Sequence, residues 1–347
     1  MILANYDHQT GKSCRTIAIR NLMARNGFDW KEDFVFGLGG GFNFSFVMPD
    51  KEVESRFFKA LSPNLFQFEN FAENLGVEYQ VITKAEDGFE LMEDILRYDD
   101  NPVLCEVSPE EYKKETQKEG THFWDGIKLE GPITSHITEV IGIDEEKVYF
   151  CENYSKDVMS VSREIFAKAR DTGKDSYLNP HHKIHYYVIP DEFEDGSMEM
   201  GVKKSISRNM RAYCDNPNER LGKKAFDSFM ENLPNCYDLY GDRLCGTSLK
   251  ITGSLIKYVS PGMFRKIYAR FLEEATKYIG YEDDLKSIAS LLKKSDFTWN
   301  KLASLFLDEE ISVKDRMIGK KCMDFMKTIK DTEEEAVLRM CEVSEAW

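Results

Sequence analysis

The sequence predicts an α+β protein, with a domain of mixed helices and strands over residues 1–192 and an all-helical domain over residues 193–347. Short hydrophobic runs bounded by polar turns in the first part, such as residues 136–143 and 148–151, are typical of strands. Beyond residue 197 the hydrophobic period is helical almost throughout. The polar segment 190–197 contains proline and glycine and breaks the pattern, so we expect the domain boundary there.

The composition allows two domains with a sizeable core, since 42% of the 347 residues are hydrophobic and 12% are aromatic. The net charge of −15, from 46 basic and 61 acidic residues, argues against general nucleic-acid binding. It is compatible with a cationic partner, although acidic surfaces also simply confer solubility.

Neither a membrane segment nor a cysteine framework is predicted. No apolar run approaches the ~18–20 residues that cross a bilayer, and residues 1–7 lack the basic and apolar regions of a signal peptide. The eight cysteines include no CxxC pair, so neither disulfides nor a zinc site is indicated. We therefore expect a reduced, cytoplasmic protein without a cofactor and without nucleic-acid or membrane partners.

The first strongly patterned stretch is a helix that begins at a cysteine. Hydrophobic residues at helical spacing predict a helix over residues 13–25. Ser13 suits the N-cap, which puts Cys14 in the first turn. The partial positive charge and unpaired N–H groups of a helix N-terminus favour a thiolate, which is the nucleophilic form of cysteine. Cys14 is therefore a candidate nucleophile, with a small core residue as the alternative.

The following segments are short helices, strands and loops. The glycines of residues 37–41 lack the GxxxxGK[ST] spacing of a phosphate loop, so we interpret them as flexible backbone close to the active site. The charged stretch 110–130, which contains His122, predicts a loop. Helices are expected over residues 57–61, 68–75 and 86–98, and strands over residues 77–83 and 103–107.

A predicted β-hairpin carries the second chemical signal. Residues 136–143 and 148–151 predict two strands joined by the polar turn 144–147. His136 opens the first strand and Glu152 follows the second, so antiparallel pairing brings these side chains near each other. Asn153, the next residue, is an alternative neighbour of His136.

Two weaker patterns lie further along the chain. The HHxxH spacing of His181, His182 and His185 falls on a predicted strand, and no carboxylate or cysteine completes a ligand set, so no metal site is predicted. Residues 200–213 predict a basic helix that carries Lys203, Lys204, Arg208 and Arg211. Other helices are expected over residues 222–232, 237–249, 263–275, 285–293, 299–306 and 313–341, with Pro261 at the start of the clearest one.

Acyl transfer by a cysteine needs a thiolate, a base that takes its proton and a group that orients the base. Cys14, His136 and Glu152 occur in the order of the papain-like arrangement, in which an N-terminal helix carries cysteine and a late hairpin carries histidine and an acid or amide. The spacing favours Glu152 as the orienting group, with Asn153 as the alternative. Gln9, five residues before Cys14, suits an oxyanion donor together with the Cys14 backbone N–H.

The first half of the chain resembles the N-terminal domain of the butirosin biosynthesis protein BtrH family. The second half resembles the helical domain that accompanies it, most visibly over residues 264–275. Two residues depart from the family pattern: Glu152 replaces the usual Asp, and Arg15 follows the cysteine where a small residue is common. Arg15 would narrow the site or hold an anionic or carbonyl group. The matching residues of the first half are 14–22, 36–41, 102–104, 136–142 and 148–150.

The resemblance implies a papain-like acyltransferase of natural-product assembly. Such an enzyme takes an acyl group from the thioester of an acyl or peptidyl carrier protein onto its cysteine and passes it to a small amine. The resemblance extends to papain-like enzymes that form amides in polythioamide antibiotic pathways such as closthioamide. The basic residues of the 200–213 helix are a candidate contact for the carrier. A cysteine peptidase or hydrolase with the same triad, or a non-catalytic binding protein on the same fold, is the alternative.

Overall fold

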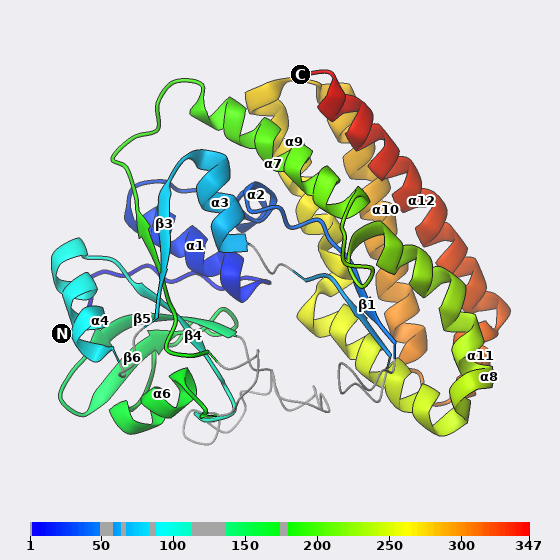
Figure 1. Ribbon diagram of the computed structural model, residues 1–347, viewed down its shortest axis with the longest axis horizontal. Helices are drawn as coiled ribbons and strands as arrows, with labels where there is room; N and C mark the ends of the chain where they lie inside the picture. The colour runs from blue at the N-terminus through cyan, green and yellow to red at the C-terminus, as the bar shows by residue number, and fades with distance from the viewer. Residues whose placement is uncertain (1, 49–57, 64–66, 84–87, 113–135, 174–179) are drawn as a thin grey trace. The chain divides into compact units, whose positions relative to one another are not determined.

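The computed structural model describes residues 2–48, 58–63, 67–83, 88–112, 136–173 and 180–347 (Figure 1). The predicted loop residue His122 lies outside these residues. The chain forms two compact units: unit 1 comprises Met1–Val35 and Gly76–Phe193, and unit 2 comprises Phe36–Leu75 and Glu194–Trp347. The chain thus leaves unit 1 next to the expected boundary, but it also visits unit 2 over Phe36–Leu75, which the sequence does not predict.

Unit 1 is built on a six-stranded antiparallel sheet in the order β3-β8-β4-β5-β6-β7. The predicted hairpin is present, because β5 and β6 pair in antiparallel fashion, with a register shift between Val140 and Gly142. β4 lies on the other side of β5 and places Val107 opposite His136. The strands are β3 (Glu78–Ile82), β4 (Val103–Val107), β5 (His136–Ile143), β6 (Lys147–Cys151), β7 (Met159–Ser162) and β8 (Ile184–Val188).

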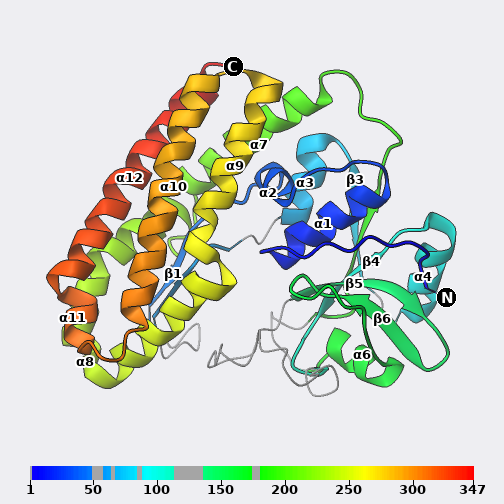
Figure 2. The same cartoon turned by 180° about the vertical axis from the view of Figure 1, so that it is seen from behind.

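Helices cover both faces of this sheet, so every residue of β5 is buried. α1 (Cys14–Arg25) packs against β5, and α6 (Arg163–Arg170) lies on the opposite side of the sheet (Figures 1 and 2). α4 (Phe89–Asp94) continues as the π-helix η1 (Ile95–Asp99).

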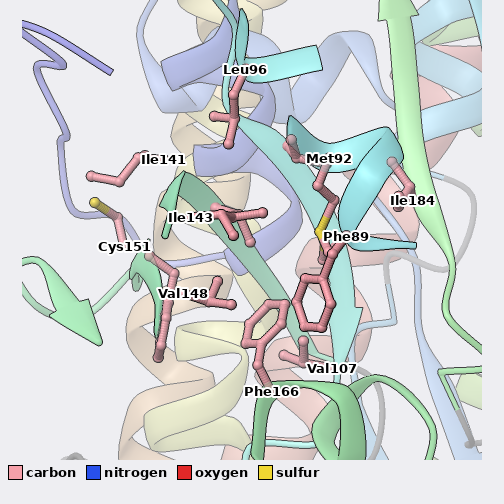
Figure 3. Close-up of a cluster of buried hydrophobic side chains, with 14 of the residues drawn as sticks. Phe89, Met92, Leu96, Val107, Ile141, Ile143, Val148, Cys151, Phe166 and Ile184 are labelled. Atoms are coloured by element: carbon pink, nitrogen blue, oxygen red, sulfur yellow. The ribbon is translucent and has the colours of Figure 1, made fainter. Parts of the chain in front are cut away.

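Side chains from α4, η1 and α6 pack against strand residues in a core cluster of unit 1. Figure 3 shows Phe89 of α4 and Phe166 of α6 close to strand residues such as Val148 and Ile143. Burying an aromatic ring of this kind stabilises the fold by roughly 1.5–3 kcal/mol relative to leaving it exposed. This apolar layer fixes the position of β5, whose first residue is His136.

Unit 2 is mainly helical, so the α+β class with a large helical C-terminal part is confirmed. α10 packs against both α9 and α12, and the bend inside α8 falls at Gly241, which has a positive φ of 66°. The elements are β1 (Ser45–Val47), β2 (Lys59–Leu61), α3 (Gln67–Leu75), α7 (Ser197–Cys214), α8 (Gly222–Ser254), η2 (Leu255–Val259), η3 (Pro261–Phe264), α9 (Arg265–Ile279), α10 (Glu282–Phe306), α11 (Val313–Ile318) and α12 (Lys320–Glu345), and α2 (Glu32–Leu38) joins the two units.

Several local predictions are wrong in unit 2. The segment expected as a helix over residues 57–61 contains β2, which pairs with β1. Pro261 begins the 3-10 turn η3, and α9 starts only at Arg265, after Met263 and Phe264 adopt left-handed backbone angles. The break between the two helices expected around Pro234 lies instead at Gly241, where α8 bends.

The glycine cluster is a close-packing feature of unit 2 rather than a loosely held loop. A Cβ atom on Gly37 would lie 1.9 Å from Cγ of Phe271, and one on Gly39 would lie 1.8 Å from Nε2 of Gln67. Real Cβ atoms do not approach neighbours so closely, so glycine is required at both positions.

A buried ion pair joins α9 to α12 within unit 2. The Arg265 guanidinium donates to both carboxylate oxygens of Glu333 at 2.9 Å, and Ser295 and Trp299 also donate to that carboxylate. Both carboxylate oxygens of Glu333 therefore have partners, as a buried charge requires.

Among the described residues, no helix combines the length and apolarity that a bilayer crossing demands.

Candidate active site

Cys14 is the first residue of α1 and is partly exposed. The Ser13 side chain caps the helix by accepting a hydrogen bond from the backbone N–H of Thr16, as predicted. The Glu32 carboxylate accepts from the backbone N–H groups of Lys12 at 2.6 Å and Ser13 at 2.8 Å. Hydrogen bonds of Ser13 with α1 and with Glu32 therefore fix the residues just before the helix. The thiol lies where a helix N-terminus favours an anion.

His136 and Glu152 meet at one end of the β5–β6 hairpin. Nε2 of His136 lies 2.5 Å from Oε2 of Glu152, and the Glu152 side chain is completely buried. The Tyr112 hydroxyl donates to the other carboxylate oxygen of Glu152 at 2.6 Å. Because Nε2 of the imidazole bonds to Glu152, Nδ1 is the nitrogen that remains for a second partner.

The charges of this group depend on each other. Burial alone would lower the pKa of His136, but the negative charges of Glu152 and Cys14 and its hydrogen bonds to both raise it to about 10. Burial alone would raise the pKa of the Cys14 thiol, but the charge of His136 and its hydrogen bond, followed by the charge of Arg15, lower it. The structure thus brings Cys14, His136 and Glu152 together, and the opposite pKa shifts of the thiol and the imidazole favour a thiolate beside an imidazolium.

The other seven cysteines have the opposite tendency. Burial raises the pKa of Cys105 and Cys245 to about 11 and that of Cys236, Cys322 and Cys341 to about 12, and it also raises those of Cys151 and Cys214. Because the thiolate is the reactive form, Cys14 stands apart from the other cysteines of the chain.

Asn153 lies beside the site but contacts a different segment. Its side-chain N–H donates to the carbonyl of Gly11 at 3.3 Å, and the Gly11 N–H donates to the Asn153 carbonyl at 2.8 Å. Asn153 therefore holds the loop before Cys14, whereas Glu152 contacts the histidine.

Gln9 lies on that same loop, and its side chain is exposed. Asn21 of α1 fixes its backbone, because the Asn21 amide donates to the Gln9 carbonyl at 3.0 Å and its oxygen accepts from the Gln9 N–H at 3.4 Å. The oxyanion role of Gln9 stays a prediction.

Two residues near the site do not stand out in the sequence. Tyr112 falls at the edge of the charged stretch that predicts a loop, yet it is fully buried against Glu152. His8 donates from Nε2 to the carbonyls of Glu152 at 2.9 Å and Ser155 at 3.1 Å. The sequence holds one weak signal for each. Tyr112 is an aromatic residue at the edge of a charged stretch, and His8 is next to Gln9.

A second buried acid lies behind His8. Glu139 accepts from the Tyr6 hydroxyl and from the Asn21 amide, and it lies 3.6 Å from Nδ1 of His8. Burial would lower the pKa of His8, but the hydrogen bond and charge of Glu139 raise it. This network ties the N-terminal segment to the end of β6 that carries Glu152.

The histidines of the HHxxH pattern do not converge. His185 contacts the Tyr79 hydroxyl at 2.7 Å and Glu106 at 3.3 Å, whereas His182 lies 3.6 Å from Asp171. In the described part of the chain, no three metal-ligating side chains gather into one cluster.

The basic helix α7 is partly neutralised within unit 2. Lys203 pairs with Glu199 at 2.6 Å, and Arg208 pairs with Glu73 at 2.6 Å. Two of its four basic side chains therefore face carboxylates of the same unit.

Comparison with protein-family models gives two matches. Residues 13–113 match the model described as butirosin biosynthesis protein H, N-terminal. Residues 166–340, slightly more than half of the chain, match the model described as a domain of unknown function, DUF4872. The chain belongs to the DUF4872 family. A search of curated proteins gave no match.

The two matches divide the candidate site of this DUF4872 protein. The BtrH match confirms the predicted resemblance for the part that carries Cys14, Arg15 and Tyr112. It ends before β5, and the DUF4872 match begins within α6, so His136 and Glu152 lie between the two matched segments. Their placement next to Cys14 comes from the structure alone.

Proposed function

We propose that this protein is a papain-like cysteine acyltransferase that moves an acyl group from a thioester through Cys14 to an amine. The observation that supports this most is the position of Cys14 at a helix N-terminus, beside a histidine that Glu152 holds, with the lowered thiol pKa that no other cysteine has. The match to the butirosin biosynthesis protein supports an acyltransferase of antibiotic biosynthesis.

In the first step the Cys14 thiolate attacks the thioester carbonyl. The Gln9 side chain and the Cys14 backbone N–H donate to the oxyanion, and such a donor contributes about 3–4 kcal/mol to transition-state stabilisation. The carbon–sulfur bond of the thioester then breaks, and the departing thiolate takes the proton of the His136 imidazolium.

In the second step an amine attacks the acyl-enzyme. Neutral His136 takes a proton from the attacking nitrogen, and Cys14 leaves as a thiolate beside the new imidazolium. Glu152 and Tyr112 stay in place through both steps and keep Nδ1 of His136 directed at the sulfur.

The proposed partners rest on the net charge of the chain and on its resemblance to the butirosin biosynthesis protein. The net charge of −15 favours a small cationic amine as the acceptor. An acyl or peptidyl carrier protein supplies the thioester, and Lys204 and Arg211 of α7 are candidates for contacting its acidic surface. Polythioamide antibiotic assembly of the closthioamide type is one pathway in which such an enzyme acts, and a cytoplasmic location would keep Cys14 reduced.

Intact-protein mass spectrometry after exposure to small acyl thioesters tests this proposal, with Cys14→Ala as the matched control. The expected result is an acyl adduct on the wild type alone, discharged faster by added amines than by buffer. An adduct that buffer discharges as fast as amines do would indicate a hydrolase. No adduct from synthetic thioesters or from an acylated carrier protein would indicate a non-catalytic binding protein.

A further inference from the structure

Two residues of the candidate site lie at the very ends of their elements. Cys14 is the first residue of α1, and Glu152 follows Cys151, the last residue of β6. Cys151 pairs with Glu139 across the hairpin, so Glu152 lies just beyond the β5–β6 ladder. The ends of helices and strands are the parts that fray most readily. Contacts made by the flanking loops therefore decide how firmly these two residues are held.

The His8 side chain joins the loop before Cys14 to the turn after β6. It is 4% exposed, and its Nε2 lies 2.9 Å from the carbonyl oxygen of Glu152 and 3.1 Å from that of Ser155. The Glu152 carbonyl also accepts from the Ser155 N–H at 3.2 Å, which closes the turn. Because a carbonyl oxygen only accepts, Nε2 carries the proton that both bonds share. One imidazole thus holds both ends of the turn that begins at Glu152.

The His8 imidazole is itself held from α1 and β5. The amide nitrogen of Asn21 on α1 lies 3.1 Å from Nδ1, and the Glu139 carboxylate on β5 lies 3.6 Å from the same atom. Asn21 also donates to the carbonyl of Gln9, the residue after His8, at 3.0 Å. Nε2 keeps its proton both in the neutral imidazole that accepts from Asn21 at Nδ1 and in the imidazolium. The two bonds to the turn therefore persist when His8 titrates.

A second link between the same two segments runs through Gly11 and Asn153. The Gly11 N–H donates to the Asn153 carbonyl at 2.8 Å, and the Asn153 amide donates to the Gly11 carbonyl at 3.3 Å. These bonds meet at one residue of each segment, so by themselves they let the turn rotate about that point. His8 binds the carbonyls of Glu152 and Ser155, on either side of Asn153. It thereby fixes the orientation of the turn.

We propose that His8 is a positioning residue: by orienting the turn at Glu152, it sets the contact of His136 with the nucleophile. The inference rests on the proposed function, in which Cys14 is the nucleophile and His136 is its base. The Glu152 carboxylate holds the His136 imidazole, so a rotation of the turn moves that imidazole relative to the sulfur. Charge attraction and acyl transfer both depend on this distance, and a misplacement of about 1 Å costs about 100-fold in rate.

The pH dependence of Cys14 alkylation tests the inference without any thioester. Folded protein is labelled with iodoacetamide across a pH series, and peptide mapping gives the pH at which the labelling rate of Cys14 is half its maximum. His8→Leu removes the donor at similar size, and it should raise this midpoint by about one unit or more, because a displaced imidazolium stabilises the thiolate less. His8→Gln places an amide N–H near the position of Nε2, so it should keep most of the wild-type midpoint.

Acylation of Cys14 by a small acyl thioester is the second readout. The rate of adduct formation, followed by intact mass, should fall about tenfold or more in His8→Leu and only slightly in His8→Gln. Ile184→Val is the matched control, because it removes one buried methyl group from β8 of the same unit. It should lower the melting temperature and leave both readouts at their wild-type values. Thermal unfolding of each variant checks that it is folded.

The two readouts separate failure of the inference from failure of the proposed function. A wild-type midpoint in folded His8→Leu, or equal midpoints in His8→Leu and His8→Gln, would overturn the inference and leave the acyltransferase intact. An equal rise in Ile184→Val would reduce His8 to a stabilising role and overturn it too. If no thioester acylates the wild type but His8→Leu still raises the midpoint, the proposed function fails and the positioning role stands. His8→Asn, whose shorter amide does not reach both carbonyls, replaces His8→Leu if that variant is unfolded, with the same expected results.

Discussion

One partly exposed thiol in unit 1, that of Cys14, has different surroundings from two partly exposed thiols in unit 2, those of Cys214 and Cys341. Cys14 in unit 1 faces the His136 imidazolium and the Arg15 guanidinium, which together lower its pKa despite burial. Cys214 and Cys341 in unit 2 lie with their sulfurs 4.0 Å apart. Burial is the main cause that raises the pKa of Cys341 to about 12. The Cys214 thiol and the nearby carboxylates raise it further.

The comparison shows that exposure alone does not make a cysteine a nucleophile. Like Cys14, the two thiols of unit 2 are partly exposed. Burial is the largest influence on both and raises their pKa values, and no nearby cation outweighs it. A positive partner that is itself held in place, as Glu152 and Tyr112 hold His136, is the feature that separates the two groups.

The largest expected effect comes from removing that positive partner. His136→Gln should reduce adduct formation from thioesters by roughly 10²–10⁴-fold, the contribution typical of a general acid–base residue. It should also make Cys14 resemble the unit 2 thiols in its reaction with iodoacetamide at about pH 7. Peptide mapping of alkylated protein measures both groups at once, and unchanged alkylation of Cys14 would contradict the assigned partner.

Removing the group that holds the histidine should have the next largest effect. Glu152→Gln replaces a charged acceptor by a neutral one, so thioester turnover should fall by roughly 10–100-fold, as for the loss of a hydrogen bond to a charged group. The Gln side chain keeps the shape and a bond to Tyr112.

Asn153→Ala is the matched control for Glu152→Gln, because Asn153 contacts Gly11 and not His136. It should change turnover less than Glu152→Gln does and should leave the pH dependence of Cys14 alkylation in place. The reverse order of the two variants would make Asn153 the orienting residue.

The pH dependence sharpens the comparison without any mutation. Because the folded pKa of Cys14 is lowered from 9.0, its thiolate persists as the pH falls below 9 and disappears only below the lowered value. Cys341, with a pKa of about 12, is protonated over the same range. Alkylation at increasing pH should therefore label Cys14 before Cys341, and simultaneous labelling of the two in folded protein would contradict the distinction.

The smallest effect is expected in unit 2. Cys214→Ser removes one member of the thiol pair at the end of α7 and should change stability by no more than about 1 kcal/mol, as is usual for a partly exposed position. Acylation and alkylation of Cys14 should match the wild type within twofold, about 0.4 kcal/mol. A larger change in Cys14 reactivity would mean that the unit 2 thiols belong to the site.

Features that depend on neighbouring residues in the chain are predicted well. The start of α1 at Cys14 with Ser13 as its cap is predicted and found, because capping is local hydrogen bonding. The β5–β6 hairpin is found for a similar reason, since two short hydrophobic runs that flank a polar turn specify it. The wrong predictions fall where distant contacts override local preference, as at Met263 and Phe264, whose left-handed backbone is buried against the rest of unit 2.

The sequence by itself determined which reactive side chains occur and in what order along the chain: a cysteine at a helix start, then a histidine, then an acid after a hairpin. Only the tertiary structure decided which groups surround them. Tyr112 on Glu152 and Glu106 beside Arg15 join residues 40 and 91 positions apart, and a charge pattern along the chain does not encode such pairings. The thiol pKa depends on these pairings, because burial and nearby charges act through space and not along the sequence.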